Sequence, residues 1–132
     1  MNTEVMFSSM TDEWNTPASL FKQLDKEFNF DSDPCPSKVP LKKGLKSEWG
    51  KRVFVNPPYS QIKGWVESCY GHWRSENALV VLLIPSRTDT KYWHDYIMKA
   101  SEIRFIKGRL KFSGHKNSAP FPSAFVVFKK IV

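Results

Sequence analysis

The chain has 132 residues, of which 41% are hydrophobic and 14% aromatic, so it is long and apolar enough for one domain with a buried core. Its formal net charge is +7, with an acidic stretch over residues 1–37 and a strongly basic body over 38–132. A basic body is typical of proteins that bind polyanions, and a merely soluble basic protein is the alternative. Two cysteines are too few for a disulfide framework, and neither a signal-peptide pattern nor a membrane-spanning run occurs, so we expect a cytoplasmic protein without a membrane partner.

The first third predicts an arm and then a helix. Residues 1–12 show no apolar periodicity, and we expect a flexible arm at the start of a single domain that spans residues 1–132. Thr16 is a favourable N-cap and Pro17 a favourable first helical residue, and apolar side chains at helical spacing over 20–28 predict one buried face. Capping alone explains Thr16 and Pro17, but free amides at a helix N-terminus can also hold a carboxylate, and both interpretations stay open.

The next segment predicts a short strand and a basic loop. The strand covers 28–32 and ends at the acidic turn Asp33-Pro34. The loop at 38–52 holds six basic residues against one acid, and its lysines either contact phosphates or are solvated loop charges. Too few residues separate Asp33 from Asn56 for two further strand–helix units.

A buried strand is predicted at Val53–Val55, and it must end where Asn56-Pro57-Pro58 begins, because prolines cannot donate to a sheet ladder. Tyr59 follows on a loop at the carboxyl end of the strand, where open α/β sheets bind ligands. This tetrapeptide suits methyl transfer to an exocyclic amine, whose lone pair is delocalised into its ring. The Asn56 side-chain oxygen and the Pro57 carbonyl can accept from the amine, and Tyr59 can stack on a base extruded from a duplex. The alternative is a strand-ending turn with a surface tyrosine.

The middle of the chain predicts a helix–strand–helix unit. Apolar and aromatic residues recur at helical spacing over 62–73, which we interpret as a core-facing stripe that includes Cys69. The unbroken apolar run at 78–84 predicts a central parallel strand buried on both faces. Arg87 follows this strand at the same sheet edge as Tyr59, where it either contacts a phosphate or base or forms a structural salt bridge. A helix capped by Thr88 or Asp89 is predicted to run to Ala100.

The last third predicts an antiparallel strand pair at the sheet edge. A strand at 102–106 turns at Gly108 and continues over 110–112, and a second strand returns over 124–128. The loop at 113–122, with the adjacent Lys111, is the best candidate for a DNA-reading element. Phe112 and Phe121 either support an extruded base or pack in the core. Neither a metal-ligand set nor a Ser/His/Asp set surrounds the loop histidine, His115.

Five stretches, in this order along the chain, carry a resemblance to a known family. They are Glu13-Trp14-Asn15-Thr16-Pro17, Phe30-Asp31-Ser32-Asp33-Pro34-Cys35, Phe54-Val55-Asn56-Pro57-Pro58-Tyr59-Ser60, Pro85-Ser86-Arg87-Thr88-Asp89-Thr90 and Gly108-Arg109-Leu110-Lys111-Phe112. Together they resemble the small phage-type DNA N6-adenine methyltransferases, the Dam-like phage family. The resemblance implies a minimal Rossmann-like α/β fold, with a mostly parallel sheet flanked by helices and a C-terminal antiparallel strand pair. It also implies S-adenosyl-L-methionine as cofactor and an adenine of double-stranded DNA as target.

The resemblance also implies roles for particular residues. The catalytic motif is Asn56, Pro57, Pro58 and Tyr59. The cofactor residues are Trp14, Asn15, Thr16, Pro17, Asp31, Asp33 and Pro34, among which the Asp33 carboxylate would accept from the cofactor's ammonium or ribose hydroxyls. The expected DNA contacts are Lys42, Lys43, Lys46, Arg87, Arg109, Lys111 and Lys116. The sequence departs from the common methyltransferase pattern because no glycine follows Asp33, and an acidic turn without a ligand is the alternative there.

Two rival functions stay open on the sequence. The same tetrapeptide occurs in methyltransferases that act on RNA bases or on protein glutamines, and the basic body favours nucleic acid without separating DNA from RNA. A catalytically inactive DNA-binding relative is the other rival, because the glycine turn is missing and the middle of the chain is abbreviated. The sequence fixes neither the recognition sequence nor the oligomeric state, for which a homodimer is one option.

Overall fold

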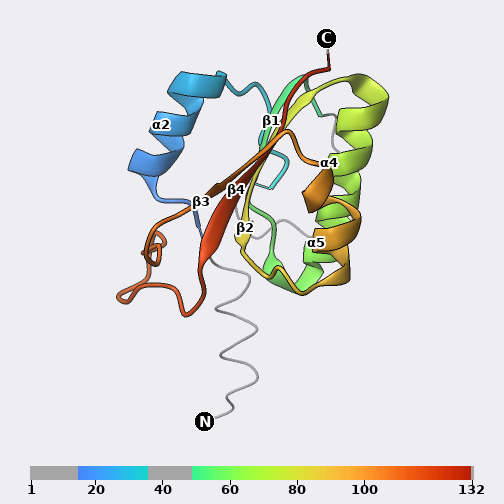
Figure 1. Cartoon of the computed structure of the whole chain (residues 1–132). Helices are drawn as coiled ribbons and strands as arrows, with labels where there is room; N and C mark the ends of the chain where they lie inside the picture. Colours follow the sequence, from blue (N-terminus) through green and yellow to red (C-terminus); the bar gives the residue numbers. More distant parts are fainter. Residues whose placement is uncertain (1–14, 36–48, 132) are drawn as a thin grey trace.

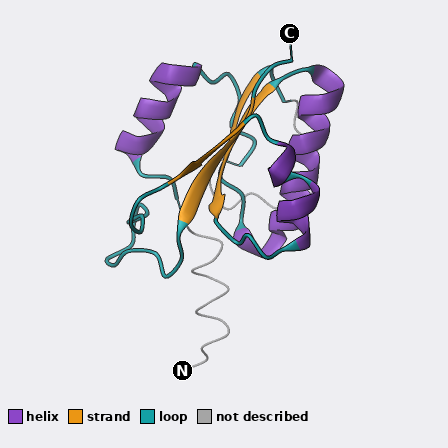
Figure 2. Ribbon diagram, in the orientation of Figure 1, coloured by secondary structure: helices purple, strands orange, loops and turns teal. Residues whose placement is uncertain are grey.

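The computed structural model describes residues 15–35 and 49–131. Within them, a four-stranded sheet is covered by helices on both faces, with α2 on one face and α4 and α5 on the other (Figures 1 and 2). The helices are α2 (Ala18–Phe28), α4 (Ile62–Glu76) and α5 (Lys91–Asp95), and the strands are β1 (Arg52–Val55), β2 (Leu79–Pro85), β3 (Glu102–Phe105) and β4 (Ser123–Phe128). Two 3-10 turns, η1 (Tyr59–Gln61) and η2 (Ile97–Lys99), follow β1 and α5. The described part of the chain contains no helix long and apolar enough to span a membrane.

The sheet has the strand order β1-β2-β4-β3. The β1–β2 pair is parallel, with Val53 opposite Val80, whereas β4 is antiparallel to both of its neighbours. The expectation of a mostly parallel sheet therefore needs correction, since the sheet is mixed and has one parallel pair of neighbouring strands. Strands β1, β2 and β3 all run in the same direction, and β4 lies between β2 and β3. The predicted C-terminal antiparallel pair at the sheet edge is confirmed, since β3 and β4 are antiparallel neighbours and β3 is the outer strand.

The side chains of the sheet alternate between two separate cores. Val53 and Val55 of β1 pack with α4 and α5, whereas Phe54 packs with α2. The predicted stripe of α4 is confirmed, because Trp65, Val66, Cys69 and Trp73 are its buried residues. All seven residues of β2 are buried, as the unbroken apolar run predicted. Because helices cover both faces of the sheet, polar residues can gather at the ends of its strands.

The strand predicted over 28–32 is reduced to one bridge. Phe28 ends α2 instead of beginning a strand, and the next residue, Asn29, has the left-handed φ of 54° common at helix C-termini. Ser32 forms a single parallel bridge with Val53, and its carbonyl accepts from the Phe54 amide at 3.0 Å. The Asp31 carboxylate accepts from the amides of the two residues before Val53, so a side chain supplies part of the pairing that a longer strand would supply.

Two helix starts also differ from the predictions. Helix α2 begins at Ala18 with Pro17 at the N-cap position, so the Thr16 hydroxyl does not cap it. Helix α5 is capped by Thr90, not by Thr88 or Asp89, and the Thr90 hydroxyl accepts from the Trp93 amide. The helix predicted to reach Ala100 ends at Asp95 and gives way to the turn η2. A single sequence shows several serine, threonine and aspartate residues that could cap a helix, and packing selects among them.

The segment at 106–122 is an ordered loop. The strand predicted over 110–112 is absent there, and positive φ angles of 76° and 83° at Gly108 and Gly114 turn the chain instead. The Ala119 amide donates to the Leu110 carbonyl at 2.7 Å, which closes the loop on itself. Phe112 and Phe121 are both buried in the core on the α2 side, so this loop is anchored by aromatic packing.

Arg104 of β3 fastens helix α2 to the outer strand. Its guanidinium donates to both carboxylate oxygens of Glu27, at 2.8 and 2.6 Å, and to Glu102 at 2.7 Å. It also lies over the Phe28 ring, 5.2 Å from the centroid. These hydrogen bonds lower the pKa values of Glu27 and Glu102. Stability from a lowered carboxyl pKa is present above the unfolded-state pKa and is lost as the pH falls through the folded-state pKa.

We therefore expect Arg104→Gln to lower the free energy of unfolding by about 1 kcal/mol at pH 7, because the bidentate pair is partly solvent-screened. The loss should shrink as the pH falls below the ordinary carboxyl pKa of 4.5 and through the lowered pKa values of Glu27 and Glu102 in the folded protein. Urea unfolding at pH 7 and pH 3.5 measures both values. Lys91→Gln removes an exposed ion pair with Asp95 and is the control, with a smaller effect. An equal loss for Arg104→Gln at both pH values would contradict the assignment to these carboxylates.

Candidate functional site

The Asn56-Pro57-Pro58-Tyr59 motif lies at the carboxyl end of β1, as the sequence predicts. Pro57 and Pro58 are buried, which fixes the backbone directly after the strand. The Pro58 carbonyl accepts from the Gln61 amide at 3.0 Å, and the turn η1 starts at Tyr59. The motif is therefore a rigid corner between a buried strand and helix α4.

A hydrogen bond joins this motif to the segment before α2. The Asn56 amide nitrogen Nδ2 donates to Thr16 Oγ1 at 3.0 Å, across 40 residues of sequence. Because Thr16 does not cap α2, its hydroxyl accepts this bond instead. The bond also turns the donor end of the Asn56 amide toward Thr16, so that the oxygen lies on the opposite branch of the amide.

A pocket of about 240 Å³ opens beside Thr16. It is lined by Asn15, Thr16, Ala18, Phe21, Asp33, Cys35 and Phe54. Three of these residues, Asn15, Thr16 and Asp33, were predicted to hold a cofactor, and the structure brings them together. The pocket also has aromatic walls that the sequence reasoning did not assign to the site. The Phe21 and Phe54 rings pack edge to face, with their centroids 5.2 Å apart.

Asp33 contributes a carboxyl group to the lining of this pocket. Burial raises the pKa of its carboxyl to about 6, and a hydrogen bond from the Cys35 amide lowers that pKa in part. By surface area Asp33 is nevertheless exposed, so its carboxyl can meet a ligand. A carboxyl kept partly desolvated in a pocket costs stability when it is ionised, and such groups concentrate at functional sites.

Other predicted cofactor residues are placed differently. Asp31 is directed away from the pocket, because its carboxylate accepts from the backbone amides of Lys51 and Arg52 at 3.1 Å each, and these bonds help to lower its pKa. Pro17 takes the N-cap position of α2, and Pro34 is not among the residues that line the pocket. Trp14 lies outside the described residues.

Tyr59 is half-buried rather than a free surface tyrosine. Its ring meets the Phe121 ring edge to face, with centroids 5.4 Å apart, and Phe121 packs in turn against Phe112. The Tyr59 hydroxyl is buried and has no hydrogen-bond partner among the described residues. Burial raises the pKa of this phenol, so it stays protonated at neutral pH. The aromatic residues of the 106–122 loop therefore support the ring of Tyr59.

Arg87 lies at the same edge as Tyr59. It follows the end of β2, is exposed, and its charge acts to lower the pKa values of Tyr59 and Tyr92, which places it close to both phenols. The Ser86 amide donates to the Pro122 carbonyl at 2.9 Å, which ties this turn to the end of the 106–122 loop.

The 106–122 loop is also tied to the pocket. Ser113 and Asn15 form an antiparallel bridge, with the Ser113 amide 3.0 Å from the Asn15 carbonyl, and the Ser113 hydroxyl donates to the Thr16 carbonyl at 3.3 Å. The sequence analysis missed Ser113, because no local pattern marks a residue that pairs with a segment 98 positions away. The loop exposes three of the predicted DNA contacts, Arg109, Lys111 and Lys116. Lys42, Lys43 and Lys46 lie outside the described residues.

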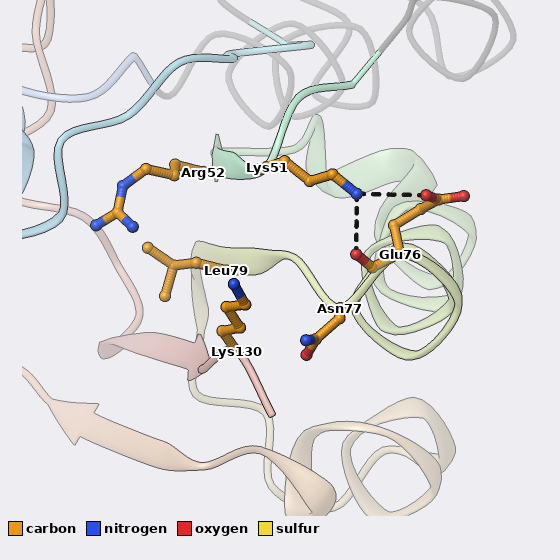
Figure 3. A pocket seen from close by; sticks show the side chains of 6 residues that line it. All are labelled: Lys51, Arg52, Glu76, Asn77, Leu79 and Lys130. Atoms are coloured by element: carbon orange, nitrogen blue, oxygen red, sulfur yellow. Dashed lines mark hydrogen bonds and ion pairs between the residues drawn. The ribbon is translucent and has the colours of Figure 1, made fainter. Parts of the chain in front are cut away.

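A second pocket, of about 330 Å³, lies where β1 and β2 begin, at the other end of these strands from the motif (Figure 3). Two of the cationic side chains at this pocket donate hydrogen bonds to carbonyl groups at the C-terminal ends of helices. Lys51 donates to the Glu76 carbonyl at the end of α4 at 3.1 Å, and Arg52 donates to the Phe28 carbonyl at the end of α2 at 2.5 Å. Cations at helix C-termini are favoured by the helix dipole, so we assign these two a structural role.

The fold and the site together define an α/β protein with a pocket and a rigid Asn-Pro-Pro-Tyr corner at one sheet edge. Residues 4–130 match the family described as DNA N-6-adenine-methyltransferase (Dam), and the chain therefore belongs to this family. This confirms the resemblance found in the sequence. The chain is similar to the DNA N-6-adenine-methyltransferase of Haemophilus phage HP1 (strain HP1c1), at 29% identity over 107 residues that cover 72% of this chain and 62% of the phage protein. It thus spans about three fifths of the length of that curated relative. No solved structure matches the chain significantly.

The raised pKa of Asp33 predicts a stability effect. A carboxyl whose folded-state pKa is raised stabilises the fold below its unfolded-state pKa, near 4, and that stabilisation is lost as the pH rises through about 6. Asp33→Asn should therefore raise the free energy of unfolding by about 1 kcal/mol at pH 8, after discounting for solvent screening, and by little at pH 4. Denaturant unfolding at the two pH values measures the difference. Asp89→Asn, at an exposed site, is the matched control. A gain of equal size at pH 4 would contradict the assignment to ionised Asp33.

Proposed function

We propose that this protein transfers a methyl group from S-adenosyl-L-methionine to the N6 amine of an adenine extruded from double-stranded DNA. The observation that carries the proposal is the Asn56–Thr16 hydrogen bond, which joins the amine-orienting motif to the pocket of the expected cofactor residues. Family membership supports the reaction class and the DNA substrate. We expect the reaction to take place in the cytoplasm, because two cysteines, too few for a disulfide framework, suit a reducing compartment.

The sheet supports a minimal Rossmann-like interpretation of the fold. The Ser32 bridge, β1 and β2 run parallel side by side, and β4 is the one reversed strand before β3. In open α/β sheets, ligands bind outside the carboxyl ends of the strands. Asn56 and Arg87 follow the carboxyl ends of β1 and β2, and Asp33 follows the residue that pairs with β1. The proposed cofactor and base sites thus share one edge.

The donor set of the pocket fits the cofactor. The Asp33 carboxylate suits an ammonium or ribose hydroxyls, Asn15 and Thr16 supply further polar groups, and Phe21 and Phe54 supply an apolar wall for a planar ring. When bound, the sulfonium cofactor supplies an activated methyl group. The residues of the chain then have to bind it, orient the amine and exclude water.

The motif residues orient the target. In our proposal, the oxygen of the Asn56 amide and the Pro57 carbonyl accept from the two N–H groups of the adenine amine, which favours a more tetrahedral nitrogen with a localised lone pair. After methyl transfer the nitrogen carries one proton too many, and this proton passes to water. The Tyr59 ring, supported by Phe121, stacks on the extruded base.

The first test is methyl incorporation from labelled S-adenosyl-L-methionine into unmethylated duplex DNA, followed by nucleoside analysis. We expect N6-methyladenine from the wild type and an at least roughly hundredfold lower kcat for Asn56→Ala, because a preorganised acceptor is lost. Asn56→Asp keeps an acceptor and is the matched control, with more activity than Asn56→Ala. RNA of the same sequence runs in parallel. Product on RNA alone, or cofactor binding without any product, would overturn the proposed DNA reaction.

The basic loop predicts a salt dependence. Lys111→Gln and Lys116→Gln should each lower the slope of log affinity against log salt by about one, because each removes one phosphate contact. Lys130→Gln, at the pocket where β1 and β2 begin, should leave the slope unchanged and is the control. Fluorescence anisotropy with a labelled duplex at several salt concentrations measures these slopes. Equal slopes for all four proteins would remove the loop from the DNA interface.

A further inference from the structure

The Thr16 hydroxyl makes a hydrogen bond that serves neither to cap helix α2 nor to bind a cofactor. Its oxygen accepts a 3.0 Å hydrogen bond from the Asn56 amide nitrogen. Helix α2 starts at Ala18, and no side chain caps it, so the hydroxyl is not engaged by the helix. Thr16 and Asn56 come from different elements, and this bond is a direct side-chain link between the pocket and the motif.

The orientation of the Asn56 amide decides what it can do. An amide has one end that accepts and one end that donates, and the two are related by a half-turn about the last side-chain torsion. The adenine amine offers two donors, so it must meet the oxygen of the amide. If the amide were turned over, its NH₂ group would face the amine, donor against donor. A hydroxyl can either donate or accept, and in this structure the Thr16 oxygen accepts from Nδ2, the arrangement that leaves the amide oxygen for the amine.

Thr16 is itself held in place from two sides. Its carbonyl accepts from the Ser113 hydroxyl at 3.3 Å, and the preceding residue, Asn15, pairs with the Ser113 backbone. On its other side, Pro17 has a φ of −58°, which its ring restricts. The Thr16 hydroxyl is thus carried on a backbone that is held in place rather than on a mobile chain end, which an orienting group requires.

We propose that Thr16 is a positioning residue: its hydroxyl holds the Asn56 amide with the oxygen toward the target amine. The proposal rests on the proposed function and deepens it. Thr16 therefore links cofactor binding to the orientation of the motif, because the same residue lines the pocket and holds the Asn56 amide.

The test compares Thr16→Val with Thr16→Ser. Valine keeps the shape of threonine without an acceptor, whereas serine keeps the hydroxyl. With DNA and cofactor both saturating, Thr16→Val should lower kcat about tenfold, the equivalent of one hydrogen bond, and Thr16→Ser should stay close to the wild type. Calorimetry should give cofactor affinities for the two variants within about threefold of each other. Unchanged kcat for Thr16→Val, with only cofactor affinity reduced, would overturn the proposal.

A second readout does not depend on activity. The side-chain NH₂ resonances of Asn56, assigned by their disappearance in Asn56→Asp, should show slow solvent exchange in the wild type and in Thr16→Ser, and fast exchange in Thr16→Val. The same exchange rates in all three proteins would contradict the orienting bond. If the wild type methylated no substrate, the proposed function would fail, while the exchange rates would still report whether Thr16 holds the amide.

Discussion

The parallel pairing of β1 with β2 is the constraint on which the site depends. With Val55 opposite Leu82, both strands end at one edge of the sheet, and both faces of the sheet are covered by helices. Polar residues that follow these strands therefore meet at this edge. The motif begins directly after Val55 and Arg87 follows the end of β2, and the loop carrying Lys111 and Lys116 closes over the same edge through Phe121. A shift of this register would separate the motif from its neighbours while leaving each local sequence unchanged.

Two long-range contacts link the motif, the pocket and the basic loop at this edge. The Asn56–Thr16 bond joins the motif to the pocket, and the pairing of Ser113 with Asn15 joins the pocket to the basic loop. The three parts expected to meet the cofactor, the base and the phosphates are thus linked by hydrogen bonds within a few residues of Thr16. Desolvation raises the pKa of Asp33, so we expect its ionised form to cost some stability, as is common at functional sites.

Local patterns predicted the elements whose determinants are local. The stripe of α4, the buried run of β2 and the corner at Asn56 were all predicted, because periodicity and prolines act within a few residues. Of the seven residues predicted to hold a cofactor, three, Asn15, Thr16 and Asp33, line one pocket. It did not predict the cap at Thr90, the bridge that replaces a strand at Ser32, or the roles of Ser113 and the aromatic pocket wall. The cap at Thr90 is local, but several nearby residues could equally have served as the cap. The others depend on partners far away in the chain, and one sequence contains no signal for such a pairing.

The central claim is that the pocket beside Thr16 and the corner at Asn56 form one reaction site. A crystal structure of the protein with S-adenosyl-L-methionine tests it most directly. The account predicts that the amino-acid end of the cofactor lies against Asn15, Thr16 and Asp33, with its methyl group directed at the space before Asn56 and Pro57. An amine that accepts from the methyl group at about 3–3.5 Å should then fit within hydrogen-bond reach of both acceptors. A cofactor bound elsewhere, or in this pocket with its methyl group directed away from Asn56, would contradict the account.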